Sequence, residues 1–104
     1  MKLGVFTVLF AQLPFEEALD RIVAEGLDAI ELGTGGYPGN AHCNPDELLS
    51  DSSKLKTFQQ AISSRGLTIS ALSCHSNPLH PQKDIAREAD TLIRQTIILA
   101  EKLD

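Results

Sequence analysis

Two polar side chains stand at places in the sequence where a small substrate could bind. Glu31 lies between the apolar residues Ile30 and Leu32, and His75 directly follows a second apolar segment. Side chains alternate along a strand, so Glu31 faces away from its two neighbours. If those neighbours pack on helices, Glu31 could hydrogen-bond a substrate or a basic partner. The alternative is a strand-end acid that reaches solvent or pairs with a lysine.

The loop after the second apolar segment adds further candidates. His75 could face a substrate, or it could be a loop histidine without a ligand. Asn77 precedes Pro78, so its side chain could contact substrate or fix the loop through an Asx-type turn. His80 stands at an expected helix start, where a capping or solvent-facing role is the simpler interpretation. We therefore take Glu31, His75 and Asn77 as candidate substrate-binding residues.

The other motifs that could carry chemistry are weak. His42 and Cys43 are adjacent, but a zinc site needs three or four ligands. The segment Gly33–Asn40 contains four glycines. Its spacing differs from the dinucleotide-binding fingerprint, and no Gly-Lys-Ser/Thr follows it. We expect this segment to form a flexible lid or a tight-turn loop.

Alternating strands and helices must position these residues. Three short, mostly apolar segments predict buried parallel strands over Leu3–Phe10, Asp28–Leu32 and Leu67–Cys74. Three segments with apolar residues at helical spacing predict amphipathic helices, which begin near Pro14, Ser52 and Gln82. We expect the first two helices to end before Gly26 and Gly66, and the third to run to the end of the sequence.

Two details of the helices can be predicted from residue types. Asn44, Pro45 and Glu47 have the spacing of a helix start with a capping box. The third helix has an expected inner stripe of Ile85, Ala89, Leu92, Ile93, Thr96, Ala100 and Leu103, which Ile97 widens.

The order β-α-β-α-β-α predicts an α/β fold with parallel strands and right-handed crossovers. Functional loops of such folds lie at the C-terminal ends of the strands. All three histidines and both long loops of this sequence fall at that end. We therefore expect any site to lie there.

Composition narrows the class of protein. The chain has 104 residues, of which 42% are hydrophobic and 22% charged, and this is typical of one soluble domain. The net charge is −5 and the basic residues are scattered, which argues against nucleic-acid and membrane partners. The two cysteines match no zinc or redox spacing. Two free thiols and no signal peptide are expected of a cytoplasmic protein.

At this point the sequence resembles a known family. The segments Gly26–Gly33, Arg65–Leu72 and Cys74–Pro81 are similar to those of sugar phosphate isomerases/epimerases, which belong to the xylose isomerase-like TIM-barrel superfamily. The resemblance covers residues 1–104 and implies three consecutive βα units, the N-terminal (βα)3 portion of such a barrel. It also implies a sugar or sugar phosphate substrate and proton transfer next to a carbonyl.

The resemblance further implies a divalent metal, which could be Mn, Mg, Co or Zn, bound in the barrel mouth. The usual ligands of the isomerases, two Glu, one Asp and one His, lie on strands of the second half of the barrel. None has a counterpart in this sequence, which is expected to stop before a fourth strand. The chain alone is therefore expected to be inert. In the endonuclease IV branch a zinc-binding histidine lies near the end of the third strand, so His75 is a candidate metal ligand.

Other functions stay open. A three-stranded parallel sheet leaves unpaired edges, so the chain could instead be a non-catalytic module that forms homo-oligomers through its strand edges. An inosose dehydratase-like lyase or an endonuclease IV-like fragment would belong to the same superfamily. The acidic charge and scattered lysines weigh against the nuclease.

Overall fold

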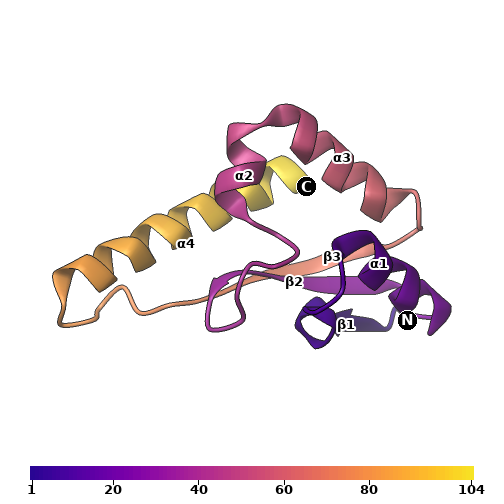
Figure 1. Cartoon of the computed structure of the whole chain (residues 1–104), viewed down its shortest axis with the longest axis horizontal. Coiled ribbons are helices and arrows are strands. Elements are labelled where there is room, and N and C mark those ends of the chain that lie inside the picture. The colour runs from indigo at the N-terminus through magenta and orange to yellow at the C-terminus, as the bar shows by residue number, and fades with distance from the viewer.

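Three parallel strands form one open sheet in the computed structural model, which describes residues 1–104. The strands are β1 (Gly4–Phe6), β2 (Ala29–Gly36) and β3 (Thr68–His75), in the order β1-β2-β3 (Figure 1). Both strand pairs are parallel. The predicted α/β class and the parallel crossovers are therefore confirmed.

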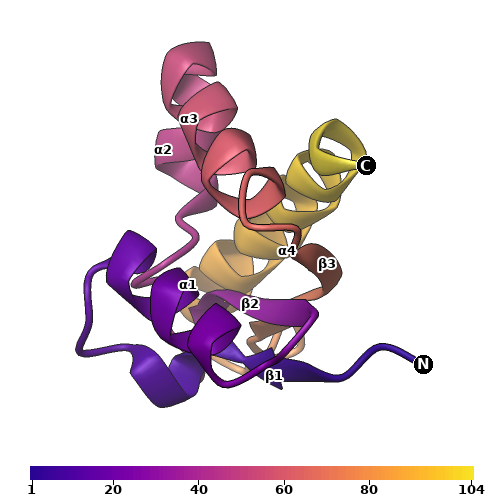
Figure 2. The same ribbon diagram turned by 90° about the vertical axis from the view of Figure 1, so that its right-hand side faces the viewer.

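Four α-helices lie on one side of this sheet and leave its other side uncovered (Figures 1 and 2). They are α1 (Phe15–Ala24), α2 (Pro45–Ser50), α3 (Ser52–Ser63) and α4 (Lys83–Leu103). Ile30 and Leu32 of β2 are fully buried under the helices, whereas Glu31 between them is only partly buried. None of the four helices combines the length and the apolar character needed to cross a bilayer.

Local capping explains why two separate helices connect β2 and β3. The side chain of Asn44 accepts hydrogen bonds from the backbone N–H groups of Asp46 and Glu47, as expected of a cap at the start of α2. The reciprocal bond of a capping box, in which the backbone N–H of Asn44 would donate to the side chain of Glu47, does not form. Asp51 then caps α3 by accepting from the N–H groups of Ser53 and Lys54, at 2.9 and 3.2 Å. The extended backbone of Asp51 separates the two helices.

The first strand is shorter than the sequence predicts. Only Gly4–Phe6 pair with β2, and residues Thr7–Phe10 form a 3-10 helix, η1. Thr7 is buried, while the apolar residues Val8 and Leu9 are exposed. A short apolar run does not by itself distinguish a strand from a helical turn. Here the pairing stops at Phe6 and Glu31, although β2 itself continues to Gly36.

The first half of the segment Gly33–Asn40 is strand, so the loop predicted over residues 33–36 is wrong, whereas the tight turn predicted as the alternative to a lid is present at Gly36–Gly39. Thr34 is fully buried, and its Oγ1 lies 2.8 Å from Oγ1 of Thr96 on α4. A Cβ at Gly35 would come within 2.6 Å of the Leu92 side chain on α4. Glycine therefore lets helix and strand approach closely here. A turn follows only at Gly36–Gly39, closed by a hydrogen bond from Gly39 N–H to Gly36 C=O.

The inner stripe of α4 also differs from the prediction. Ala89, Thr96 and Leu99 are its buried residues, whereas Ile85 and Ile97 are 41% and 64% exposed. The start of α4 projects beyond the sheet, at the end of the 44 Å long axis (Figure 1). Apolar spacing defines a helix, but the position of the neighbouring elements decides which part of the stripe is covered.

Gly36 and Gly39 provide a matched test of the turn. Both have φ near +70°, but a Cβ at Gly36 would overlap the carbonyl oxygen of His75, whereas a Cβ at Gly39 would meet nothing. We expect Gly39→Ala to lower the free energy of unfolding by about 1–2 kcal/mol, the cost of left-handed backbone. Gly36→Ala should lose at least about 1 kcal/mol more, because it also displaces the His75 peptide, which accepts a hydrogen bond from Tyr37 N–H. If urea unfolding showed the same loss of free energy of unfolding for both variants, this account would be contradicted.

Candidate functional site

Glu31 and Ser73 form a polar pair on the uncovered side of the sheet. Ser73 Oγ donates a short hydrogen bond to Oε1 of Glu31, from the neighbouring strand. Ser73 is 8% exposed and Glu31 is half-buried. Glu31 forms no ion pair, so the lysine partner considered from the sequence is not its partner here. Its second carboxylate oxygen can accept a hydrogen bond from a hydroxyl group.

A hollow of about 400 Å³ opens beside this pair. Its walls come from the start of all three strands, and its polar side chains are Lys2, Glu31, Thr68 and Ser70. Lys2 Nζ donates to Oγ1 of Thr68 at 2.8 Å, which ties the two edge strands together across this side. Ser70 Oγ donates to the carbonyl oxygen of Ile30 at 3.1 Å. The uncovered side is therefore polar and internally hydrogen-bonded.

His75 is the last residue of β3 and is exposed. It lies two positions after Ser73, so strand alternation turns both side chains to the same side of the sheet. Its imidazole has no hydrogen-bonding partner in the chain, while its carbonyl oxygen accepts from Tyr37 N–H at 2.9 Å. The imidazole is thus available to a ligand at the C-terminal end of the strands.

Asn77 and His80 hold the loop that follows. Asn77 Oδ1 accepts a hydrogen bond from Leu79 N–H at 3.0 Å, which is the Asx-type turn considered as its structural role. Its amide N–H groups and the second lone pair of Oδ1 are left for a substrate. His80 Nδ1 accepts from Gln82 N–H at 3.0 Å, which fixes the loop before α4. Gln82 is the N-cap residue and α4 has no side-chain cap, so the capping role considered for His80 is not observed. The structure therefore brings together Glu31 and Ser73, and leaves Asn77 on the adjoining loop.

The residues of this chain do not by themselves assemble a metal site. No group of three or more His, Cys, Asp or Glu side chains lies close enough to hold an ion. His75 could supply at most one ligand, and a stable divalent site needs three or more from protein and substrate. The groups that this chain offers to a substrate are therefore its hydrogen-bonding side chains.

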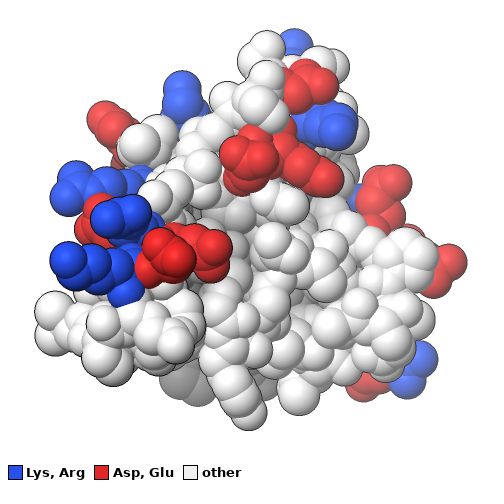
Figure 3. Space-filling model, turned by 60° about the vertical axis from the view of Figure 1, so that its left-hand side comes forward, with Lys and Arg blue, Asp and Glu red and all other residues white.

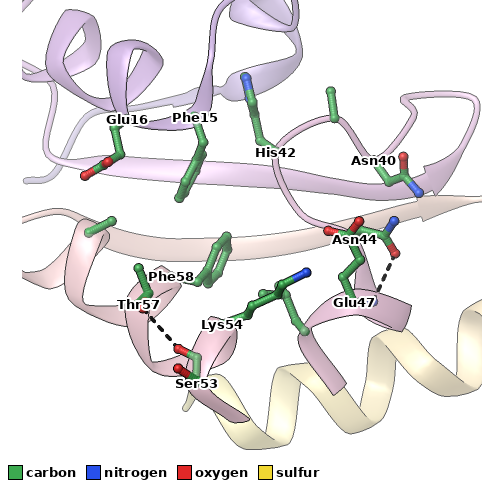
Figure 4. A pocket seen from close by; sticks show the side chains of 13 residues that line it. Phe15, Glu16, Asn40, His42, Asn44, Glu47, Ser53, Lys54, Thr57 and Phe58 are labelled. Atoms are coloured by element: carbon green, nitrogen blue, oxygen red, sulfur yellow. Dashed lines mark hydrogen bonds between the residues drawn. The ribbon is translucent and has the colours of Figure 1, made fainter. Parts of the chain in front are cut away.

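A second concave region lies on the helical side of the sheet (Figure 4). This groove, of about 550 Å³, opens between α1, the segment 40–44, α2 and α3. The rings of Phe15 and Phe58 stack at its centre, with centroids 4.9 Å apart. Asn40, Asn44, Glu47 and Lys54 lie at one end, and Glu16 and Thr57 at the other.

His42 has a structural role at this groove that sequence reasoning did not find. Its Nε2 lies 2.8 Å from the carbonyl oxygen of Leu13, and because a carbonyl only accepts, Nε2 carries the proton. The ring also packs against Phe15, with centroids 5.7 Å apart. His42 thereby fastens the 40–44 segment to the chain before α1. The 29-residue separation of the two partners leaves no local signal in the sequence.

Both cysteines are free thiols, as the sequence predicted. Cys43 is 1% exposed, and burial raises the pKa of its thiol from 9.0 to about 12. Cys74 is partly buried, with its Sγ 3.7 Å from Oγ of Ser76. A neutral, buried Cys43 behaves as a small apolar core residue.

Cys43 should make stability fall at alkaline pH. Because its folded pKa of about 12 lies above the unfolded value near 9.0, the unfolded state loses the proton first. The stabilisation is complete below pH 9 and is lost as the pH rises toward 12, by about 1.4 kcal/mol per pH unit. Urea unfolding at several pH values above 9, under reducing conditions, should show this slope in Cys74→Ala and not in Cys43→Ala. The same slope in both variants would assign the effect to other groups.

The sequence of this chain was compared with those of known proteins. No family model matches the sequence. The chain is similar to the uncharacterized protein YfiH of Bacillus subtilis (strain 168), with 44% identity over 81 residues. The match covers 78% of this chain and 26% of YfiH, so the chain spans about a quarter of the length of the relative.

Proposed function

We propose that this chain forms the first three βα units of a xylose isomerase-like barrel and contributes part of a sugar isomerase/epimerase site. The observation that carries the proposal is the Glu31 carboxylate, held by Ser73 on the uncovered side of a parallel sheet. In a closed barrel that side would be the interior, and its strand ends would face the substrate. The polar groups of the sheet then meet a polyhydroxylated ligand instead of bulk water.

Within this proposal each residue has a simple task. Ser73 orients the carboxylate of Glu31 through its hydrogen bond, and the free oxygen of that carboxylate accepts a proton or a hydroxyl hydrogen bond from the substrate. His75, at the end of the adjacent strand, hydrogen-bonds a substrate oxygen. A divalent metal, when bound by ligands outside these residues, would supply Lewis-acid stabilisation of the oxyanion.

The test uses YfiH, because this chain matches only part of it. A chimera carries this chain in place of the matching segment of YfiH and is incubated with Mn²⁺ and a panel of ketohexoses in D₂O. We expect NMR to show deuterium entering next to the carbonyl with the chimera, and no exchange with the isolated chain.

Glu31→Gln should then slow the exchange by about 100-fold or more, the usual share of a general base. Glu25→Gln is the matched control, because Glu25, directly after α1, is an exposed carboxylate paired with Arg21. A chimera that loses nothing on Glu31→Gln, or an isolated chain that is itself active, would contradict the proposal.

A self-associating module is the second candidate, and one feature favours it. A groove of about 560 Å³ follows the unpaired edge of β3, between that strand, α3 and the end of α4. Its apolar lining includes Ile62, Leu67, Ile69, Leu72 and Leu103. An unpaired strand beside an apolar groove suits the docking of another strand from a second copy.

Sedimentation velocity distinguishes this candidate. We expect the wild-type chain to form a concentration-dependent dimer, and Ala100→Glu to be monomeric, because Ala100 is exposed and lines the groove. Ile97→Glu is the matched control on the same helix, at a position 64% exposed and outside the groove. Both changes should leave the free energy of unfolding within about 0.5 kcal/mol of wild type. A wild-type monomer at all concentrations would exclude the module.

A further inference from the structure

The loops that follow the three strands contain no Lys, Arg, Asp or Glu. We call residues 7–13, 36–41 and 75–81 the strand-end face; they lie at the C-terminal end of the parallel sheet. None of the nine Lys and Arg or the 14 Asp and Glu residues falls within them. Figure 3 shows the charged side chains around the margin of a broad area of other residues.

The charges nearest to this face along the chain do not favour an anion. The first charged residue behind it on β2 is Glu31, which is itself anionic. Lys2 lies before β1, at the opposite end of the strands, and is bonded to Thr68. Lys83 follows in the first turn of α4, next to Asp84, where the helix projects away from the sheet. A phosphate group at this face would find no lysine or arginine of these strands and loops to neutralise it. Lys54 of α3 lines the neighbouring groove with Asn40, and the carboxylate Glu47 lines the same groove.

Each of the three loops exposes at least one large apolar side chain. Leu9, Tyr37 and Leu79 are 67%, 96% and 89% exposed. Hydrogen-bonding groups accompany them, namely the imidazole of His75 and the amide of Asn77. Apolar surface combined with a few neutral polar groups matches a ligand that has C–H faces and hydroxyl groups and no charge.

Tyr37 is the aromatic residue of the three, and it is held on a hydrogen-bonded turn. It occupies the turn Gly36–Gly39, which is closed by the hydrogen bond from Gly39 N–H to Gly36 C=O at 3.1 Å. Its own N–H donates to the carbonyl oxygen of His75 at 2.9 Å, so the backbones of Tyr37 and His75 are adjacent. An exposed aromatic ring on a fixed turn can contact a ligand at low entropic cost.

We propose that the strand-end face binds an uncharged polyhydroxylated ligand, in preference to its phosphate ester, and that Tyr37 packs against the ring of that ligand. The inference rests on the proposed sugar site and goes beyond it, because it names the charge class of the substrate. Tyr37 is then a specificity residue: it binds the substrate without transferring a proton.

The experiment compares two probes that differ only in the phosphate. The ¹⁵N-labelled chain is titrated with D-fructose and with D-fructose 6-phosphate, and amide shifts are followed by NMR. We expect D-fructose to shift the amides of residues 36–39 and 75–77, and D-fructose 6-phosphate to bind there at least about tenfold more weakly.

Variants at two positions show which group discriminates. Tyr37→Ala should weaken D-fructose binding about three- to tenfold, whereas Tyr37→Phe should retain it, since the ring is kept. Asn40→Lys adds a cation three residues after Tyr37 and should raise the affinity for D-fructose 6-phosphate toward that for D-fructose.

The outcomes separate the inference from the proposed function. Equal or tighter binding of the phosphate ester at these amides would overturn the inference and leave the sugar site standing. No shift of these amides with either probe would overturn the inference, whereas the proposed function is decided by the exchange experiment on the chimera. Shifts at residues 36–39 that depend on protein concentration alone would show that a second copy occupies the face, which would also overturn the inference.

Discussion

The contact between β2 and α4 is the constraint on which the rest of the structure depends. Thr34 Oγ1 donates to the carbonyl oxygen of Ser73, so the proton it shares with Thr96 at 2.8 Å must come from Thr96. One chain of hydrogen bonds thus runs from α4 through β2 to β3, where all three residues are buried. Breaking either bond would leave a buried polar group unpaired, at a cost of about 1–3 kcal/mol. The helix therefore fixes both strands together.

This contact on the covered side sets the geometry of the strand ends. Gly35 lets Leu92 of α4 come close to the strand, and β2 consequently extends to Gly36 and pairs with His75. The turn at Tyr37 begins only there. Tyr37 N–H and the carbonyl oxygen of His75 meet because the two strands end together. A change beneath the sheet, at Thr34 or Thr96, would accordingly alter the groups offered at its end.

Sequence reasoning was most successful where the signal is local. The order of elements, the cap at Asn44 and the helix end near Gly26 depend on neighbouring residues, and the structure has them. The need for glycine in β2 could not be predicted in this way, because Gly35 makes room for a side chain of a helix about 60 residues later. Glu31 was identified as a site candidate, but its partner Ser73 was not. That pairing depends on a register that shifts twice between β2 and β3, and no periodicity reveals such a shift.

The proposed sugar site and the proposed docking groove lie on different surfaces, although closure into a barrel would also use the free edge of β3. The uncovered side of the sheet carries a carboxylate oriented by a serine and further hydroxyl groups, and such a surface suits water or a polar ligand. The groove at the β3 edge is apolar and lies beside unpaired backbone groups, so it suits another strand. Covering that edge would leave Glu31 and the strand-end face open, and would add a fourth strand end beside His75. Closure of the sheet by further strands, from the same or another chain, would therefore complete the site and leave its polar side free.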